Sequence, residues 1–153
     1  MTDLSKYKER VFEIIGAAMA VHNELGWGLL EPVYNEALHL ELLERGIDNE
    51  SEKTLHCYYK GHLLEKTYRM DIVAGDIVVE LKSVEEISQP HRAQLFNYLR
   101  LTQSPIGLLI NFGQNSLMGE RYYYNKETNE CVLLNRNMEP FYQADKLQQI
   151  NYF

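Results

Sequence analysis

The spacing of apolar residues predicts two helices at the start of the chain. In residues 5–24 apolar side chains recur at helical spacing, and they are Val11, Ile14, Ile15, Ala18 and Met19. Gly26 follows as a natural stop, and Pro32 suits the first position of a second helix that a glycine cap at Gly46 ends. The apolar stripe continues through this helix at Val33, Ala37, Leu38, Leu42 and Leu43.

The period then changes to that of strands. Residues 53–60 and 63–73 read as two strands around Gly61, and a turn at Ala74-Gly75 leads into a third strand at 76–83. Ser88 is predicted to cap a third helix over 88–101, with Ala93, Phe96 and Leu99 on its apolar side. Residues 105–112 form a short apolar run, and 121–125 and 131–135 are predicted as two more strands. The segment after Pro140 receives no prediction.

These elements predict a mixed α/β or α+β fold. The 153 residues fit one domain over 1–153, and no apolar run approaches the roughly 20 residues that span a bilayer, so we expect no membrane partner. The N-terminus lacks the apolar core of a secretory signal. Cys57 and Cys131 show no metal-site spacing and read as reduced thiols, so we expect a cytoplasmic protein.

Three charged residues lie in the otherwise apolar stretch YRMDIVAGDIVVELKS, residues 68–83. Alternate residues of a strand share a face, so Glu80 and Lys82 point away from the side that Val79 and Leu81 give to the core. With Ala74-Gly75 as a two-residue loop, Asp71 pairs with Val78 and lies diagonal to Glu80 on that same face, about 7–8 Å away between backbones. A loop one residue longer would turn Asp71 to the core.

Two carboxylates at that separation can converge on one cation. Mg²⁺ takes one or two carboxylates with waters and substrate phosphate, and Asp71, Glu80 and the backbone carbonyl of Leu81 offer such oxygens. Lys82 can hold an attacking water and oppose charge that develops on a phosphate. The alternative is an ion-pair ladder on a solvent-exposed sheet face.

Two further segments carry polar residues that suit the same cleft. In GLLEPVY, Glu31 lies at the N-terminal edge of the second helix, where it could be a third carboxylate directed at the metal. The alternative is an acidic helix start without a function, which the helix dipole favours in any case. Tyr34 can either pack in the core or reach the site. In QLFNY, Gln94 and Tyr98 share a helix face. Gln94 could orient Lys82 or a phosphate and Tyr98 could bind a phosphate, or they are a solvated glutamine and a half-buried tyrosine.

The order of these features resembles that of the PD-(D/E)XK nuclease superfamily, particularly its RecB-like and phage-exonuclease-like branch. There a helical Glu and a Q-x-x-x-Y helix accompany the D…E-x-K strands. More narrowly, GLLEPVY resembles the motif of the GxxExxY protein family. The resemblance runs from about residue 7 to about residue 125. One departure is that Met70, instead of Pro, precedes Asp71.

The resemblance implies a restriction-endonuclease-like core, which is a central mixed β-sheet flanked by helices, and Mg²⁺- or Mn²⁺-dependent cleavage of phosphodiesters. Asp71 and Glu80 match the metal ligands, and Lys82 matches the catalytic lysine. Glu31 matches the helical acidic residue, and Gln94 and Tyr98 match the accessory helix pair.

We therefore expect a metal-dependent nuclease that acts on DNA. The net charge of −7 counts against a protein that simply coats nucleic acid, but not against an enzyme that meets it at one site. Two alternatives stay open, a non-catalytic nucleic-acid- or protein-binding module on the same fold and a phosphoesterase for a nucleotide or RNA. The sequence leaves open whether the protein is a monomer or a homo-oligomer.

Overall fold

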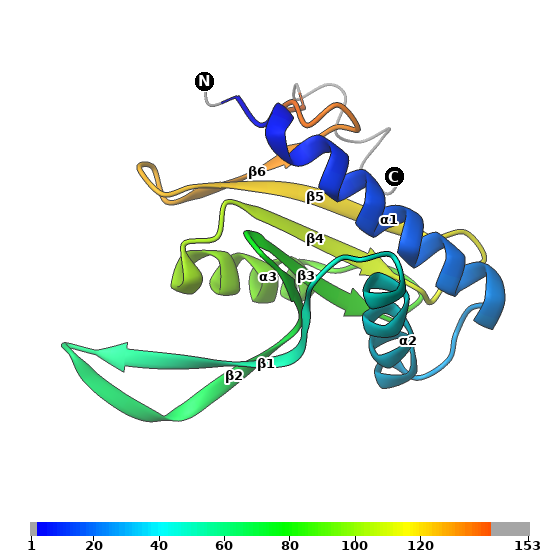
Figure 1. Ribbon diagram of the computed structural model, residues 1–153. Coiled ribbons are helices and arrows are strands. Elements are labelled where there is room, and N and C mark those ends of the chain that lie inside the picture. The colour runs from blue at the N-terminus through cyan, green and yellow to red at the C-terminus, as the bar shows by residue number, and fades with distance from the viewer. Residues whose placement is uncertain (1–2, 142–153) are drawn as a thin grey trace.

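The structure is a computed structural model, and it describes residues 3–141 (Figure 1). Three helices and six strands follow one another along this part of the chain. In order they are α1 (Ser5–Leu25), α2 (Glu31–Glu44), β1 (Glu50–Tyr59), β2 (His62–Ala74), β3 (Ile77–Lys82), α3 (Gln89–Thr102), β4 (Ile106–Asn111), β5 (Met118–Asn125) and β6 (Glu130–Leu134). The expected segments are confirmed, with boundaries shifted by a few residues.

The six strands form one mixed sheet in the order β1-β2-β3-β4-β5-β6. Only β3 and β4 pair in parallel among these strands, and α3 makes the crossover between them. Both strands are buried along almost their whole length, which explains their continuous apolar sequences. The expected α+β fold with a central mixed sheet is confirmed.

Helices cover both faces of this sheet. One core contains the buried apolar residues of α1 and α2 together with Ile72, Val79 and Leu81. A second core contains Leu95 and Leu99 of α3 together with Val78 of β3. Alternation along β3 therefore sends neighbouring residues into different cores, and its last residues, Glu80 and Lys82, continue the alternation of Val78.

The buried faces of the helices differ in detail from the predicted stripes. Met19, Val33 and Leu43 are all more than 40% exposed, and Ala93 is exposed as well. In α2 the buried apolar residues are Tyr34, Leu38 and Leu42, which are spaced four apart. Val33 and Leu43 lie next to this buried stripe and are not part of it. The buried positions of α3 are Leu95, Tyr98 and Leu99.

The predicted helix ends are confirmed. Gly26 follows α1 with a φ of +77°, which favours glycine. Ser88 is the N-cap of α3, and its backbone N–H donates to Nδ1 of His91 at 3.0 Å. The cysteines 57 and 131 are free. Within residues 3–141 no helix has the length and apolar character that crossing a membrane requires.

Candidate active site

The hydrogen-bond ladder between β2 and β3 stops just short of the charged residues. Its last pair is Ile72 with Val79. Beyond it, Oδ2 of Asp71 accepts the backbone N–H of Leu81 at 2.8 Å, and the carbonyl of Asp71 accepts a hydrogen bond from the Asn35 amide at 3.2 Å. The Asp71 carboxylate thus stays fastened beside β3 at the point where the backbone ladder ends.

The turn between β2 and β3 corrects one prediction. Ala74 pairs with Ile77, so the two-residue turn is Gly75-Asp76 instead of Ala74-Gly75. Continued by one step past Ile72 and Val79, this register sets Asp71 opposite Glu80 instead of diagonal to it. Moving a two-residue turn by one position shifts every partner by two, and a shift of two keeps each residue on its face. The carboxyl groups of Asp71 and Glu80 are close enough to share a hydrogen bond.

Glu80 is a buried acid whose hydrogen bonding is incomplete. The residue is 2% exposed, and its Oε2 has no hydrogen-bond partner. Burial, followed by the hydrogen bond and the negative charge of Asp71, raises the pKa of Glu80 to about 10. Lys82 opposes this increase. A buried carboxyl oxygen without a partner costs free energy, and a bound cation would supply the missing interaction.

Lys82 is held by a chain of side chains on α3. Its Nζ donates to Oε1 of Gln94 at 3.0 Å, and Nε2 of Gln94 donates to the Tyr98 hydroxyl at 3.0 Å. That hydroxyl donates in turn to the backbone carbonyl of Arg69 at 3.3 Å. Of the two roles considered for Gln94, the structure therefore favours the orientation of Lys82.

Tyr98 lies on the helix face predicted for it but is more deeply buried than either proposed role requires. Its side chain is buried, and burial together with the charge of Glu80 raises its pKa to about 12. Because its hydroxyl is already bonded to Gln94 and to the Arg69 carbonyl, Tyr98 supports Gln94 instead of offering a free contact to phosphate. The predicted face shared by Gln94 and Tyr98 is present, but the Tyr98 end of it is inside the second core.

Tyr34 takes the core position of the two considered, and its predicted contact with substrate is corrected. Its ring is fully buried and stacks on Phe112 at a centroid distance of 4.4 Å. Its hydroxyl donates to the Gly26 carbonyl at 2.8 Å and accepts the Leu29 N–H at 3.0 Å. Tyr34 therefore shapes the loop that leads to Glu31.

Glu31 lies within electrostatic reach of the same group. Burial raises its pKa, the charge of Asp71 adds to the increase, and Lys82 opposes it. Within residues 3–141 no three His, Cys, Asp or Glu side chains lie close enough to form a metal site by themselves. The described residues thus fit a site in which Asp71 and Glu80 hold the cation while water, phosphate or a backbone carbonyl completes its shell. The predicted ligand roles of Glu31 and of the Leu81 carbonyl stay predictions.

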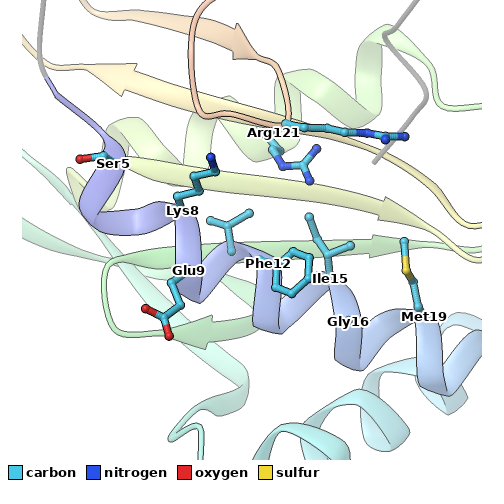
Figure 2. A pocket seen from close by; sticks show the side chains of 10 residues that line it. Ser5, Lys8, Glu9, Phe12, Ile15, Gly16, Met19 and Arg121 are labelled. Atoms are coloured by element: carbon cyan, nitrogen blue, oxygen red, sulfur yellow. The ribbon is translucent and has the colours of Figure 1, made fainter.

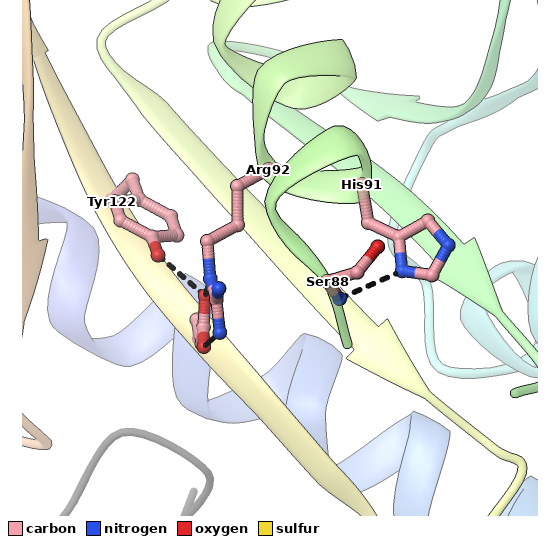
Figure 3. Close-up of polar contacts among 5 residues, drawn as sticks. Ser88, His91, Arg92 and Tyr122 are labelled. Atoms are coloured by element: carbon pink, nitrogen blue, oxygen red, sulfur yellow. Dashed lines mark hydrogen bonds and ion pairs between the residues drawn. The ribbon is translucent and has the colours of Figure 1, made fainter. Parts of the chain in front are cut away.

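Sequence reasoning missed a second buried acid that fixes α3 (Figure 3). Nε and Nη2 of Arg92 donate to the two carboxylate oxygens of Glu120 at 2.8 Å each, and the Tyr122 hydroxyl donates to the same carboxylate. This contact ties the first turns of α3 to β5, and so positions Gln94. Arg92 and Glu120 are separated by 28 positions in the sequence, which leaves no local signal by which the pair could have been found.

A cavity of about 600 Å³ lies elsewhere in the molecule, where α1 faces Arg121 of β5 (Figure 2). Phe12, Ile15 and Met19 of α1 give it apolar walls. None of the predicted site residues lines it. This cavity is therefore separate from the acidic site.

Comparison with known proteins agrees with this geometry. A family model described as the PD-(D/E)XK nuclease superfamily matches residues 8–123. The chain belongs to this superfamily. Asp71, Glu80 and Lys82 lie within the matched range, and the structure brings the carboxylate of Asp71 on β2 to the backbone N–H of Leu81, between Glu80 and Lys82 of β3. Their match to the D and E-x-K of the family's name stays a prediction.

Other comparisons add little about this PD-(D/E)XK protein. No curated protein matches it. Among the solved structures to which it is similar is one described as "Crystal structure of SSO0001", at 20% identity and a TM-score of 0.47. The similarity covers 91% of this chain and 62% of that chain, so the protein spans less than two thirds of the length of that structure.

Proposed function

We propose that this PD-(D/E)XK protein is a Mg²⁺- or Mn²⁺-dependent nuclease that hydrolyses phosphodiester bonds in DNA. One observation carries the proposal. The buried and incompletely bonded carboxyl group of Glu80 lies against Asp71, next to a lysine that α3 holds in place. A structural ion pair would leave no oxygen without a partner, whereas a cation site needs one.

Each residue has a distinct task in this proposal. Asp71 and Glu80 would hold the cation, and Glu80 would release its proton when the cation binds. The bound cation would polarise the phosphate and lower the pKa of a coordinated water. Lys82 would hold the attacking water and balance the charge that develops on the phosphate, while Gln94 keeps its ammonium in position. Glu31 would add negative potential that favours the cation.

The finer assignments belong to the same proposal. Gly28, Glu31 and Tyr34 support the GxxExxY family, and Gln94 with Tyr98 supports the RecB-like branch. The two free cysteines are consistent with a cytoplasmic location. A homo-oligomer is an option that sedimentation of the full chain would test.

The test is cleavage of single-stranded DNA, duplex DNA and RNA with Mg²⁺ or Mn²⁺. We expect Glu80→Ala and Lys82→Ala each to lower the cleavage rate by about 10³-fold or more, because the first removes a ligand of the cation and the second removes the charge that stabilises the reacting phosphate. Lys126→Ala, at an exposed lysine in the turn after β5, is the matched control and should cleave like the wild type. Circular dichroism verifies that each variant is folded.

Two outcomes would contradict the proposal. Full cleavage by both Glu80→Ala and Lys82→Ala would show that the chemistry lies elsewhere. No cleavage by the wild type on any of the three substrates would favour the non-catalytic binding module that the sequence also allows. Calorimetric titration with Mn²⁺ separates these cases, since binding that Glu80→Ala abolishes places the cation at β3 whatever the substrate.

A further inference from the structure

The outer halves of β1 and β2 form a two-stranded arm that extends beyond the helices (Figure 1). We define the arm as residues 54–69, from Thr54 to its partner Arg69, with the turn at Lys60-Gly61 as its tip. Every residue of β2 from His62 to Arg69 is exposed, and at the base of the arm Leu55 packs against the second core, so most of the arm lies outside both cores. A two-stranded ribbon is at best marginally stable by itself, so its length calls for a functional explanation.

Large aromatic and aliphatic side chains are exposed along this arm. Tyr58 and Tyr59 are 66% and 61% exposed near the tip. The other exposed members of the set are Leu63, Leu64 and Tyr68. Tyr59, Leu64 and Tyr68 lie on one face of the ribbon, and Tyr58 and Leu63 lie on the other. So many exposed apolar side chains on so small an element are typical of an interaction site.

The charge of the arm is opposite to that of the whole chain. Lys60, Lys66 and Arg69 against Glu65 give the arm a net charge of +2, while the whole chain carries −7. The Nζ atom of Lys60 lies 5.4 Å from the centre of the Tyr59 ring. Arg69 is held only loosely, with its guanidinium 3.9 Å from Glu52 and largely exposed. Cations interleaved with exposed aromatic rings match the phosphates and bases of a nucleic acid.

The arm is also continuous with the candidate active site. Tyr68 packs edge-on against Tyr98 with ring centroids 5.8 Å apart. The Tyr98 hydroxyl bonds to the Arg69 carbonyl and to Gln94, which holds Lys82. A chain that lies along the arm would therefore reach the site past Tyr68.

We propose that the arm binds single-stranded nucleic acid and leads it to Lys82. The second half of this statement rests on the proposed nuclease function, while the first half stands independently of it. Single strands expose the flat faces of their bases, which can stack on Tyr58 and Tyr59, whereas a duplex hides those faces. A second copy of the chain is a poorer occupant, because β1 is the edge strand, Lys53 lies on it and Lys60 follows it in the turn.

The experiment measures binding without cleavage. Fluorescence anisotropy of a labelled mixed-sequence DNA oligonucleotide, single-stranded or annealed to its complement, is followed in EDTA at several salt concentrations. Tyr58→Ala and Tyr59→Ala should each weaken single-strand binding by about fivefold or more. Lys66→Ala and Lys60→Asn should each reduce the magnitude of the slope of log K against log salt by about 0.7. Asn is chosen for position 60 because the backbone of Lys60 has a φ of +49°, a conformation that Asn adopts more readily than Ala.

Matched controls lie outside the arm. Phe12→Ala removes an aromatic ring that is 76% exposed on α1, and Lys126→Ala removes an exposed lysine. Both should bind like the wild type. The proposal is overturned if the arm variants bind as tightly as these controls, if duplex is bound as tightly as single strand, or if the wild type binds neither. It is also overturned if sedimentation shows a dimer that Tyr58→Ala dissociates.

The arm and the nuclease proposal can fail separately. Binding lost in the arm variants, with no cleavage by the wild type in Mg²⁺ or Mn²⁺, would support the arm and contradict the nuclease. Cleavage that Lys82→Ala abolishes, with unchanged binding by the arm variants, would support the nuclease and overturn the arm.

Discussion

Glu80 and Glu120 are two buried acids in one sheet with opposite surroundings. Each residue is 2% exposed. Glu120 on β5 receives two hydrogen bonds from Arg92 and one from Tyr122. Glu80 on β3 faces other acids, Asp71 and Glu31, and its Oε2 has no partner.

The difference separates a structural acid from a candidate functional one. Removing a charge from water is tolerated when hydrogen bonds and an opposite charge replace the water, and this is the situation of Glu120. Glu80 lacks that compensation, so its side chain is disposed to take up a proton or a cation. Burial alone would not have told the two residues apart.

The largest expected effect comes from removing the charge of Glu120, the acid whose hydrogen bonds are complete. Glu120→Gln should lower the free energy of unfolding by about 3 kcal/mol, because the Arg92 guanidinium, only 15% exposed, loses its opposite charge. Urea denaturation followed by circular dichroism measures this change. A loss no larger than that from a surface substitution such as Lys126→Ala would mean that the Arg92 pair contributes little.

A smaller effect concerns the support of Lys82. Gln94→Ala should lower the cleavage rate roughly 10- to 100-fold, because it removes the neutral partner of a charged hydrogen bond without touching either carboxylate. The matched control is Gln89→Ala, at an exposed glutamine at the start of the same helix. Equal rates for both variants would show that Lys82 needs no positioning by α3.

The smallest expected effect is a change in stability with pH that arises from Glu80, the acid with an unpartnered oxygen. In EDTA, Glu80 ionises near its usual pKa in the unfolded chain but near 10 in the folded one, so the unfolded state releases a proton over that range. Stability should therefore be fully present below about pH 4.5 and should fall as the pH rises toward 10. Glu80→Gln removes this dependence.

Thermal unfolding measures this last prediction. The melting temperatures of wild type and Glu80→Gln should be similar at pH 5, and the variant should be higher by about 3 °C or more at pH 9. The same substitution at the other acid, Glu120→Gln, should lower the melting temperature at both pH values. Parallel pH profiles for wild type and Glu80→Gln would show that Glu80 carries a charge without metal.

Local sequence patterns predicted much of the fold. The order of helices and strands, the Gly26 stop and the Ser88 cap depend on neighbours in sequence, and all of them are confirmed. The predicted helix stripes were wrong at Met19, Val33, Leu43 and Ala93. The predicted position of the β2–β3 turn was wrong by one residue, because Ala74-Gly75 and Gly75-Asp76 offer similar local turn chemistry. The face of Asp71 did not depend on that choice, since its alternation with Ile72 was decided by the core.

The sequence by itself determined the order of the acids and the face on which Asp71, Glu80 and Lys82 lie, because strand alternation is a local property. Only the tertiary structure decided that Glu80 lacks a partner, that Gln94 holds Lys82 and that Tyr34 is in the core. It also decided that Arg92 donates hydrogen bonds to the Glu120 carboxylate and that β1 and β2 extend as an arm. These features arise from contacts between distant elements, whose energy depends on burial and on partners that no local pattern records.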